Sequence, residues 1–157
     1  MDLSIKTPCI GVCSTTSLGD AVCRGCKRYA FEVIHWNSYA PEAKASVLNR
    51  IEKLVTQILE NKLQIFSETD LMRGLEQARV PFDQNLSPWC WLHNLLRKHH
   101  EQITDLNEYG ACVLPKFSHL TLAQLSGQIE KELLVLCEAH LDRYYKLPSD
   151  PCNGGTG

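Results

Sequence analysis

The amino-acid sequence predicts a mainly α-helical protein with a small N-terminal module that binds a metal ion or cluster through four cysteines. Four of the eight cysteines fall within residues 8–26, and most of the chain after residue 40 carries apolar residues at the three- and four-residue spacings of amphipathic helices. A chain of 157 residues can bury one core and carry one small additional module. We expect a cysteine module over residues 1–40, a helical domain over residues 41–147 that can include one short β-hairpin, and a flexible tail over residues 148–157.

Charge and hydropathy restrict the class of protein. The formal net charge is -2 and no segment is strongly basic, so charge alone gives weak support for nucleic-acid binding. The first residues lack the basic start and apolar stretch of a secretory signal, and no apolar run has the length needed to cross a bilayer. We therefore expect a cytoplasmic protein with no membrane partner, in which clustered cysteines are metal ligands or redox groups more often than disulfides.

The cysteine cluster consists of two short pairs separated by a nine-residue loop: Cys9 with Cys13, and Cys23 with Cys26. Two cysteines two or three residues apart can place both thiolates on one centre within a single turn of backbone. We expect Gly25 to adopt a positive φ, which would close the turn and point its N–H groups at the sulfurs. The spacing therefore predicts that four thiolates converge on one metal centre.

Spacing alone leaves the nature of the centre open. Zinc and iron–sulfur clusters both accept four thiolates, and a basic sequence around the second pair, Arg24, Lys27 and Arg28, would stabilise either one. A thiol redox pair made of Cys23 and Cys26 is a further alternative, although no thioredoxin-like strand and helix pattern surrounds it. The remaining cysteines are widely separated and are expected to be ordinary thiols: Cys90, Cys112, Cys137 and Cys152.

Hydrophobic spacing predicts the regular elements of the chain. Helices are expected over residues 29–36, 41–62, 67–80, 87–100 and 121–146. Capping signals start three of them, namely Ser67 with Asp70, Ser87 before Pro88, and Thr121 with Gln124. Two short apolar runs, residues 103–106 and 111–114, flank a turn and predict a β-hairpin. The aromatic face of the first helix, which includes Trp36, is expected to lie over the metal site.

The simplest interpretation of several histidines is an ordinary structural role. His99 and His100 end a helix, where positive charge complements the helix dipole. The same region resembles part of a winged helix, which keeps nucleic-acid binding as a weaker alternative. His35 lies close to the cluster in sequence and is expected to be a neighbouring donor at most. We find no serine–histidine–aspartate order, phosphate-binding glycine loop or paired-carboxylate motif, so an enzyme interpretation has no residues to support it.

The segment "PCIGVCS…DAVCRGCKRYAFEVIHW" resembles a small bacterial family, the YdhL-like predicted iron–sulfur proteins, over about residues 7–60. The matching positions are Pro8, Cys9, Cys13, Cys23, Arg24, Gly25, Cys26, Glu32, Val33, Ile34 and Trp36. The chain departs from the family where Lys27 and Arg28 stand in place of a Gly-Arg pair. The resemblance implies an iron–sulfur cluster held by the four cysteines of the motif, and it implies no reaction.

These observations give two expectations for function. The first is a non-catalytic iron–sulfur protein that acts in electron transfer, in redox sensing or as an accessory factor, and that contacts a partner protein through its helical domain. The second is a zinc-stabilised module that binds protein or nucleic acid, in which the metal serves only to fold the N-terminus.

Overall fold

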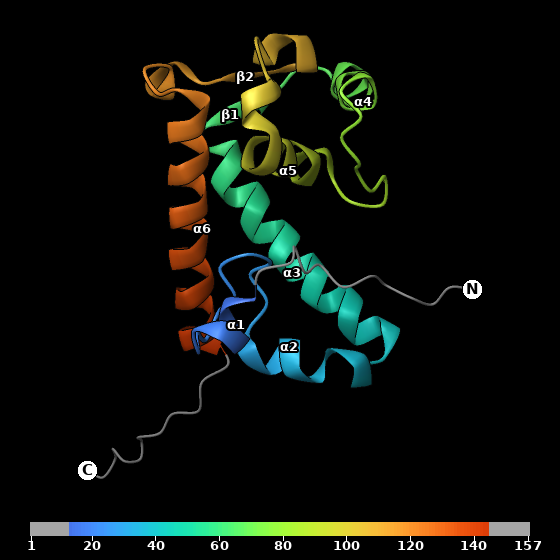
Figure 1. Ribbon diagram of the computed structural model, residues 1–157, viewed down its shortest axis with the longest axis vertical. Helices are drawn as coiled ribbons and strands as arrows, with labels where there is room; N and C mark the ends of the chain where they lie inside the picture. The colour runs from blue at the N-terminus through green and yellow to red at the C-terminus, as the bar shows by residue number, and fades with distance from the viewer. Residues whose placement is uncertain (1–12, 145–157) are drawn as a thin grey trace. The chain divides into compact units, whose positions relative to one another are not determined.

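The computed structural model describes residues 13–144, and 67% of these residues are helical, so the mainly α-helical prediction is confirmed (Figure 1). The α-helices are α1 (Ser14–Ser17), α2 (Ala30–His35), α3 (Pro41–Glu60), α4 (Glu68–Gln77), α5 (Pro88–His99) and α6 (Leu122–Tyr144). The strands are β1 (Leu63–Ile65) and β2 (Ala111–Val113), and the 3-10 helices are η1 (Trp36–Ser38), η2 (His100–Gln102), η3 (Leu106–Tyr109) and η4 (Pro115–Phe117). No helix in the described range is both long and apolar enough to span a membrane.

The chain divides by its internal contacts into two compact units. Unit 1 comprises Met1–Leu48 with Leu134–Gly157, and unit 2 comprises Asn49–Leu133. Helices α3 and α6 each begin in one unit and end in the other. The domain boundaries at residues 40 and 147 stay predictions, and the tail over residues 148–157 lies outside the described residues.

Side-chain caps start two helices as predicted. At the start of α4 the hydroxyl oxygen of Ser67 accepts the backbone N–H of Asp70 at 3.1 Å. Before α6 the capping box is reciprocal, because the N–H of Thr121 donates to Gln124 Oε1 at 2.9 Å and the N–H of Gln124 donates to Thr121 Oγ1 at 3.1 Å. These bonds satisfy N–H groups that a helix leaves without an intrahelical partner.

The start of α5 differs from the prediction. Ser87 occupies the N-cap position before Pro88, but its side chain makes no capping hydrogen bond. Instead its backbone N–H donates to the carboxylate of Glu52, on α3, at 2.9 Å. A carboxylate is a stronger acceptor than a hydroxyl, and it also suits the positive end of the helix dipole. Glu52 therefore satisfies the N–H of the N-cap residue itself, and the predicted capping bond from the Ser87 hydroxyl is absent.

The predicted β-hairpin is correct in one strand and wrong in its partner. Residues 111–113 form β2, whereas Leu106, in the other predicted strand, begins η3. The partner of β2 is β1, and the two strands pair antiparallel with Leu63 opposite Val113 (Figure 1). Gly110 explains the difference, because its φ of +69° ends η3 in a left-handed turn rather than a hairpin loop.

The core of unit 2 consists mainly of leucine-rich faces from four helices. Helices α3, α4, α5 and α6 contribute side chains less than 2% exposed, and these include Leu59, Leu71, Leu75, Leu92, Leu95, Leu96, Leu125, Ile129 and Leu133. Helix α4 contacts both α5 and η3. Because full burial of each such side chain contributes about 1.5–3 kcal/mol before entropic costs, this core is the main stabilising element of unit 2.

An ion pair at the edge of this core predicts a pH dependence. Lys62 is 4% exposed, and its Nζ lies 2.9 Å from Glu132 Oε1 and 4.5 Å from the ring centroid of Phe117. Burial raises the pKa of Glu132, but hydrogen bonds from Gln128 and Lys62 outweigh this and hold the pKa below 4.5. A lowered folded-state pKa contributes stability above 4.5 that is lost as the pH falls.

Thermal unfolding at a series of pH values checks this expectation. We expect the Glu132→Gln variant to melt below the wild type at pH 7, because Lys62 loses its counter-charge. The gap between the two proteins should shrink as the pH falls through and below 4.5, where the wild-type carboxylate becomes protonated. A gap that stays constant with pH would show that the pair does not contribute through its charge.

Candidate metal centre

The structure describes three of the four predicted ligands, and these three lie in two separate segments. Cys9 lies outside the described residues, and Cys13 directly precedes α1. Cys23 and Cys26 lie in a turn whose two ends form an antiparallel bridge between Val22 and Tyr29. Every residue from 22 to 29 except Arg24 is buried. The second cysteine pair is therefore held inside unit 1 by a closed turn.

Backbone hydrogen bonds close this turn. The N–H of Cys23 donates to the carbonyl of Arg28 at 2.9 Å, and the N–H of Lys27 donates back to the carbonyl of Cys23 at 2.9 Å. The positive φ predicted for Gly25 belongs instead to Lys27, with φ +69°. The Lys27 ammonium folds back and donates to the carbonyl of Arg24 at 2.5 Å and to that of Gly25 at 3.3 Å. These bonds offset the cost of a left-handed conformation in a residue with a side chain.

The sulfur of Cys23 is surrounded by hydrogen-bond donors. The N–H groups of Cys26, Ser14 and Gly25 all donate to it. Burial raises the pKa of the Cys23 thiol, but these donors outweigh burial and lower it below 9.0. The N–H groups of the turn thus point at a sulfur, as the sequence predicted. Such donors stabilise a thiolate in preference to a neutral thiol.

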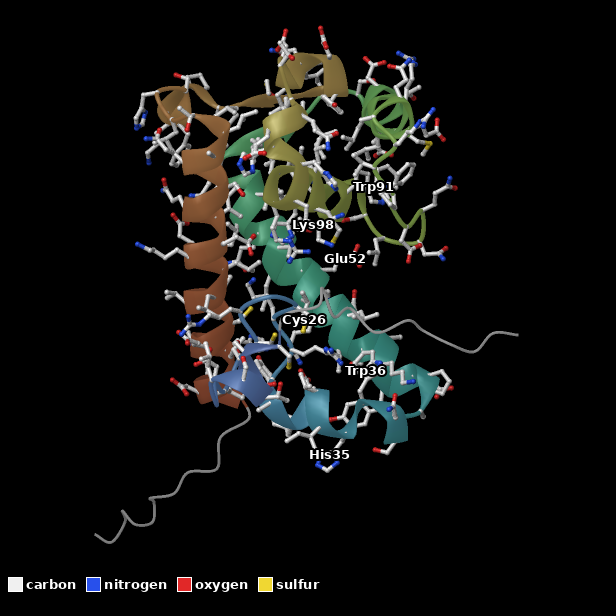
Figure 2. All side chains as sticks on the ribbon, viewed as in Figure 1. Cys26, His35, Trp36, Glu52, Trp91 and Lys98 are labelled. Atoms are coloured by element: carbon white, nitrogen blue, oxygen red, sulfur yellow. The ribbon has the colours of Figure 1, made fainter. Side chains whose placement is uncertain are left out.

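The sulfur of Cys26 faces a buried cation. Arg28 Nε donates to Cys26 Sγ at 3.2 Å, and the guanidinium lies 4.8 Å from the ring centroid of Trp36. Arg28 is 4% exposed. Burial raises the pKa of the Cys26 thiol above 9.0, and the hydrogen bond and charge of Arg28 limit that rise without reversing it. A guanidinium is always charged, so Arg28 would stabilise a Cys26 thiolate once one forms. Figure 2 shows Cys26 and Trp36 in unit 1.

Hydrogen bonds favour the thiolate form of Cys13, and its sulfur contacts the hydroxyl of Thr15. Its Sγ lies 3.1 Å from Thr15 Oγ1, and hydrogen bonds from Thr15 and Thr16 lower its pKa to about 6. The following residue, Ser14, is buried against the turn, because its N–H donates to the Cys23 sulfur and its hydroxyl oxygen accepts the N–H of Arg24 at 2.8 Å. The backbone beside Cys13 is therefore fixed next to the second cysteine pair.

The structure brings two of the four predicted ligands together. Cys23 and Cys26 lie in the same closed turn, and the Cys26 side chain is among the groups that lower the pKa of Cys23. Within residues 13–144, no group of three or more histidine, cysteine, aspartate or glutamate side chains is placed to hold a metal ion, so Cys13 does not complete a triad with this pair. The donors around the pair are nonetheless those that stabilise metal-bound thiolates, so these residues fit a thiolate centre.

Other sulfur and imidazole groups have different surroundings. His35 is exposed, and Figure 2 shows its ring directed away from Cys26. Burial and the nearby charge of Glu52 raise the pKa of Cys90 to about 11, so this thiol is protonated and inert at neutral pH. The pKa of Cys13, which belongs to the motif, is thus lowered, whereas the pKa of Cys90, which lies outside the motif, is raised.

Sequence reasoning missed the role of three residues around the sulfurs. Arg28 was expected to add positive charge, but nothing in the spacing showed that its Nε reaches Cys26. Ser14 and Thr15 gave a weak signal, because they follow Cys13 at the start of a helix. Helix starts expose N–H and hydroxyl donors, and such donors lower the pKa of neighbouring cysteines.

Residues 7–54 match the model of DUF1289, described as a protein of unknown function. The match contains all four cysteines of the motif and covers less than half of the chain. It ends close to the limit at residue 60 expected from the resemblance. No curated protein matches the chain, and no solved structure matches it either. The matched segment, residues 7–54, is thus similar to a cysteine-rich domain of unknown function.

Proposed function

We propose that the DUF1289 segment binds a metal centre through the thiolates of Cys9, Cys13, Cys23 and Cys26, and that the protein is a non-catalytic iron–sulfur protein. One observation carries the proposal: both sulfurs of the buried turn are supplied with donors that suit a thiolate. Backbone N–H groups donate to Cys23, and the buried guanidinium of Arg28 donates to Cys26. A bound cluster would supply one-electron redox chemistry.

Charge supports this proposal. Four thiolates around a divalent ion, or around a cluster of the same charge, carry a net charge of about −2. An anionic centre of this kind compensates a buried guanidinium, which would otherwise be costly to remove from water. Arg28 is such a group, and Trp36 covers its other face. The arrangement is therefore consistent with a buried anionic centre next to Cys26.

In this proposal the protein acts in electron transfer, in redox sensing or as an accessory factor, and its helical domain contacts a partner protein. Phe66, which is 52% exposed, offers an apolar side chain for such a contact.

Metal and acid-labile sulfide analysis of the full chain, purified without oxygen, tests the proposal together with a visible spectrum. Iron and sulfide in a coloured protein that bleaches on reduction would support an iron–sulfur protein. Stoichiometric zinc without sulfide would support the zinc-stabilised module in its place. Protein that contains neither metal under these conditions, and takes up neither on reconstitution, would contradict both.

Arg28 offers a separate test of the thiolate environment. We expect Arg28→Gln to weaken metal binding about 10- to 100-fold, because the donor and the positive charge at Cys26 are both lost. Competition with a chromophoric chelator measures this affinity directly.

Arg24→Gln is the matched control. Arg24 lies in the same turn, but its side chain is 62% exposed and pairs with Asp20 at 2.9 Å. We expect its metal affinity to equal that of the wild type, because an exposed ion pair contributes little. Equal losses in the two variants would show that Arg28 acts only through the general charge of the segment.

A further inference from the structure

The hydrogen bond from Arg28 to Cys26 requires the guanidinium to lie in one orientation. Nε is one of several N–H donors on a long side chain with many rotamers, and it lies 3.2 Å from Cys26 Sγ. Other rotamers would present a different nitrogen to the sulfur or move the guanidinium away from it. A group that holds the plane of the guanidinium would therefore keep Nε at the sulfur.

Trp36 is placed to hold this plane. The Cζ atom of Arg28 lies 4.8 Å from the centroid of the Trp36 ring, and both residues are 4% exposed. Guanidinium groups stack on aromatic rings, and the attraction is strongest for tryptophan and for groups removed from water. From this geometry we infer that Trp36 is a positioning residue, which holds the Arg28 guanidinium against Cys26 and acts on the thiolate centre through it. The inference rests on the proposed function, because it assigns Trp36 a role at the same centre.

The indole is itself held by neighbours within unit 1. Trp36 begins η1, and the centroid of its ring lies 6.2 Å from that of Tyr39. Lys44, in α3, places its Nζ 5.7 Å from the centroid of the Trp36 ring. Of these two cations over Trp36, Arg28 is the one that donates to a cysteine sulfur within the described residues. Lys44 therefore offers a matched control for the contact of a cation with this ring.

The NMR resonance of the Arg28 Nε–H group tests the placement directly. In the reduced full chain with one equivalent of zinc(II), we expect its proton to be shifted upfield, because the guanidinium lies over the Trp36 ring. Trp36→Phe keeps an aromatic ring and should keep most of the shift. Trp36→Leu keeps an apolar side chain without a ring, so the resonance should return to the usual arginine range. A wild-type resonance within that range, or one that Trp36→Leu leaves unmoved, would overturn the inference.

Zinc(II) affinity, measured by competition with a chromophoric chelator, tests whether Trp36 acts through Arg28. We expect Trp36→Leu to weaken binding about 10-fold, as loss of an outer-shell partner does, and Trp36→Phe to weaken it by about 2-fold or less. Because the effect passes through Arg28, Trp36→Leu should cause no further loss in the Arg28→Gln protein.

Lys44→Gln removes the other cation from the same ring, and its zinc affinity should equal that of the wild type. Three results would overturn the inference, because each shows that Trp36 does not act through Arg28. These are an unchanged affinity in Trp36→Leu, equal losses in Trp36→Leu and Lys44→Gln, and a loss from Trp36→Leu that persists in the Arg28→Gln protein.

The two measurements separate the inference from the proposed function. If the wild type bound metal but its Arg28 resonance did not depend on Trp36, the inference would fail and the proposed function would stand. If the wild type bound neither zinc nor iron, the proposed function would fail, and the Arg28 resonance would still decide whether Trp36 positions the guanidinium.

Discussion

Replacing both cysteines of the buried turn, in the variant Cys23→Ser/Cys26→Ser, should abolish metal binding and open the segment between Val22 and Tyr29. A serine hydroxyl stays protonated at neutral pH and is a poor ligand for a soft metal ion. Structural metal sites contribute about 10–16 kcal/mol of binding free energy to small modules. Even partial loss of this contribution should raise amide hydrogen exchange across residues 22–30 by at least about 100-fold.

Metal analysis and hydrogen exchange monitored by mass spectrometry measure the two effects. The matched control is Cys90→Ser/Cys112→Ser, which removes the same chemical groups outside the motif. Cys90 is a suitable control because burial and Glu52 keep its pKa near 11, so it is not a thiolate at neutral pH. Full metal content in the turn variant, or loss of metal in the control, would contradict the assignment of the ligands.

Gly110→Ala should be the most destabilising single substitution that we propose in unit 2. Gly110 has a φ of +69°, and a Cβ at this position would lie 2.2 Å from the carbonyl oxygen of Ser67. Its own carbonyl accepts the N–H groups of Phe66 and Ser67 at 2.8 and 3.1 Å. Since the clash is with backbone, relief requires a shift that weakens these bonds. We expect the free energy of unfolding to fall by about 3 kcal/mol.

Denaturant unfolding measures this change against Gly127→Ala. Gly127 lies within α6, and a Cβ there would contact nothing within 4 Å. We expect this control to raise stability by about 0.5–1 kcal/mol, because alanine favours the helix over glycine. If Gly110→Ala changed the free energy of unfolding as Gly127→Ala does, the left-handed turn before β2 would not be required for the stability of unit 2.

Local signals explain which parts of the fold were predictable. The caps at Ser67 and Thr121 and the helix start at Pro41 depend on residues within one turn of each other, and the structure has all three. The pairing of β2 with β1 was missed because it joins Leu63 to Val113 across a long stretch of chain, and three-residue strands leave no alternation to detect. At α5 the sequence signals gave the N-cap position of Ser87 and the following Pro88 correctly, but not the bond from the Ser87 N–H to Glu52, which lies on another helix.

Cysteine spacing predicted that Cys23 and Cys26 lie in one turn, and the structure has this turn. The set of four ligands stays a prediction. The choice of Lys27 rather than Gly25 for the left-handed position was not predictable, because it depends on the ammonium finding carbonyl partners in the folded turn. The contact between Arg28 and Cys26 likewise depends on the packing of Trp36.

X-ray absorption at the edge of the bound metal tests the central claim most directly, because it counts the atoms bonded to the ion. For the full chain purified without oxygen, a thiolate centre predicts a first shell of sulfur at about 2.3 Å with no nitrogen or oxygen. A first shell of nitrogen and oxygen atoms would contradict the claim that Cys9, Cys13, Cys23 and Cys26 hold the metal.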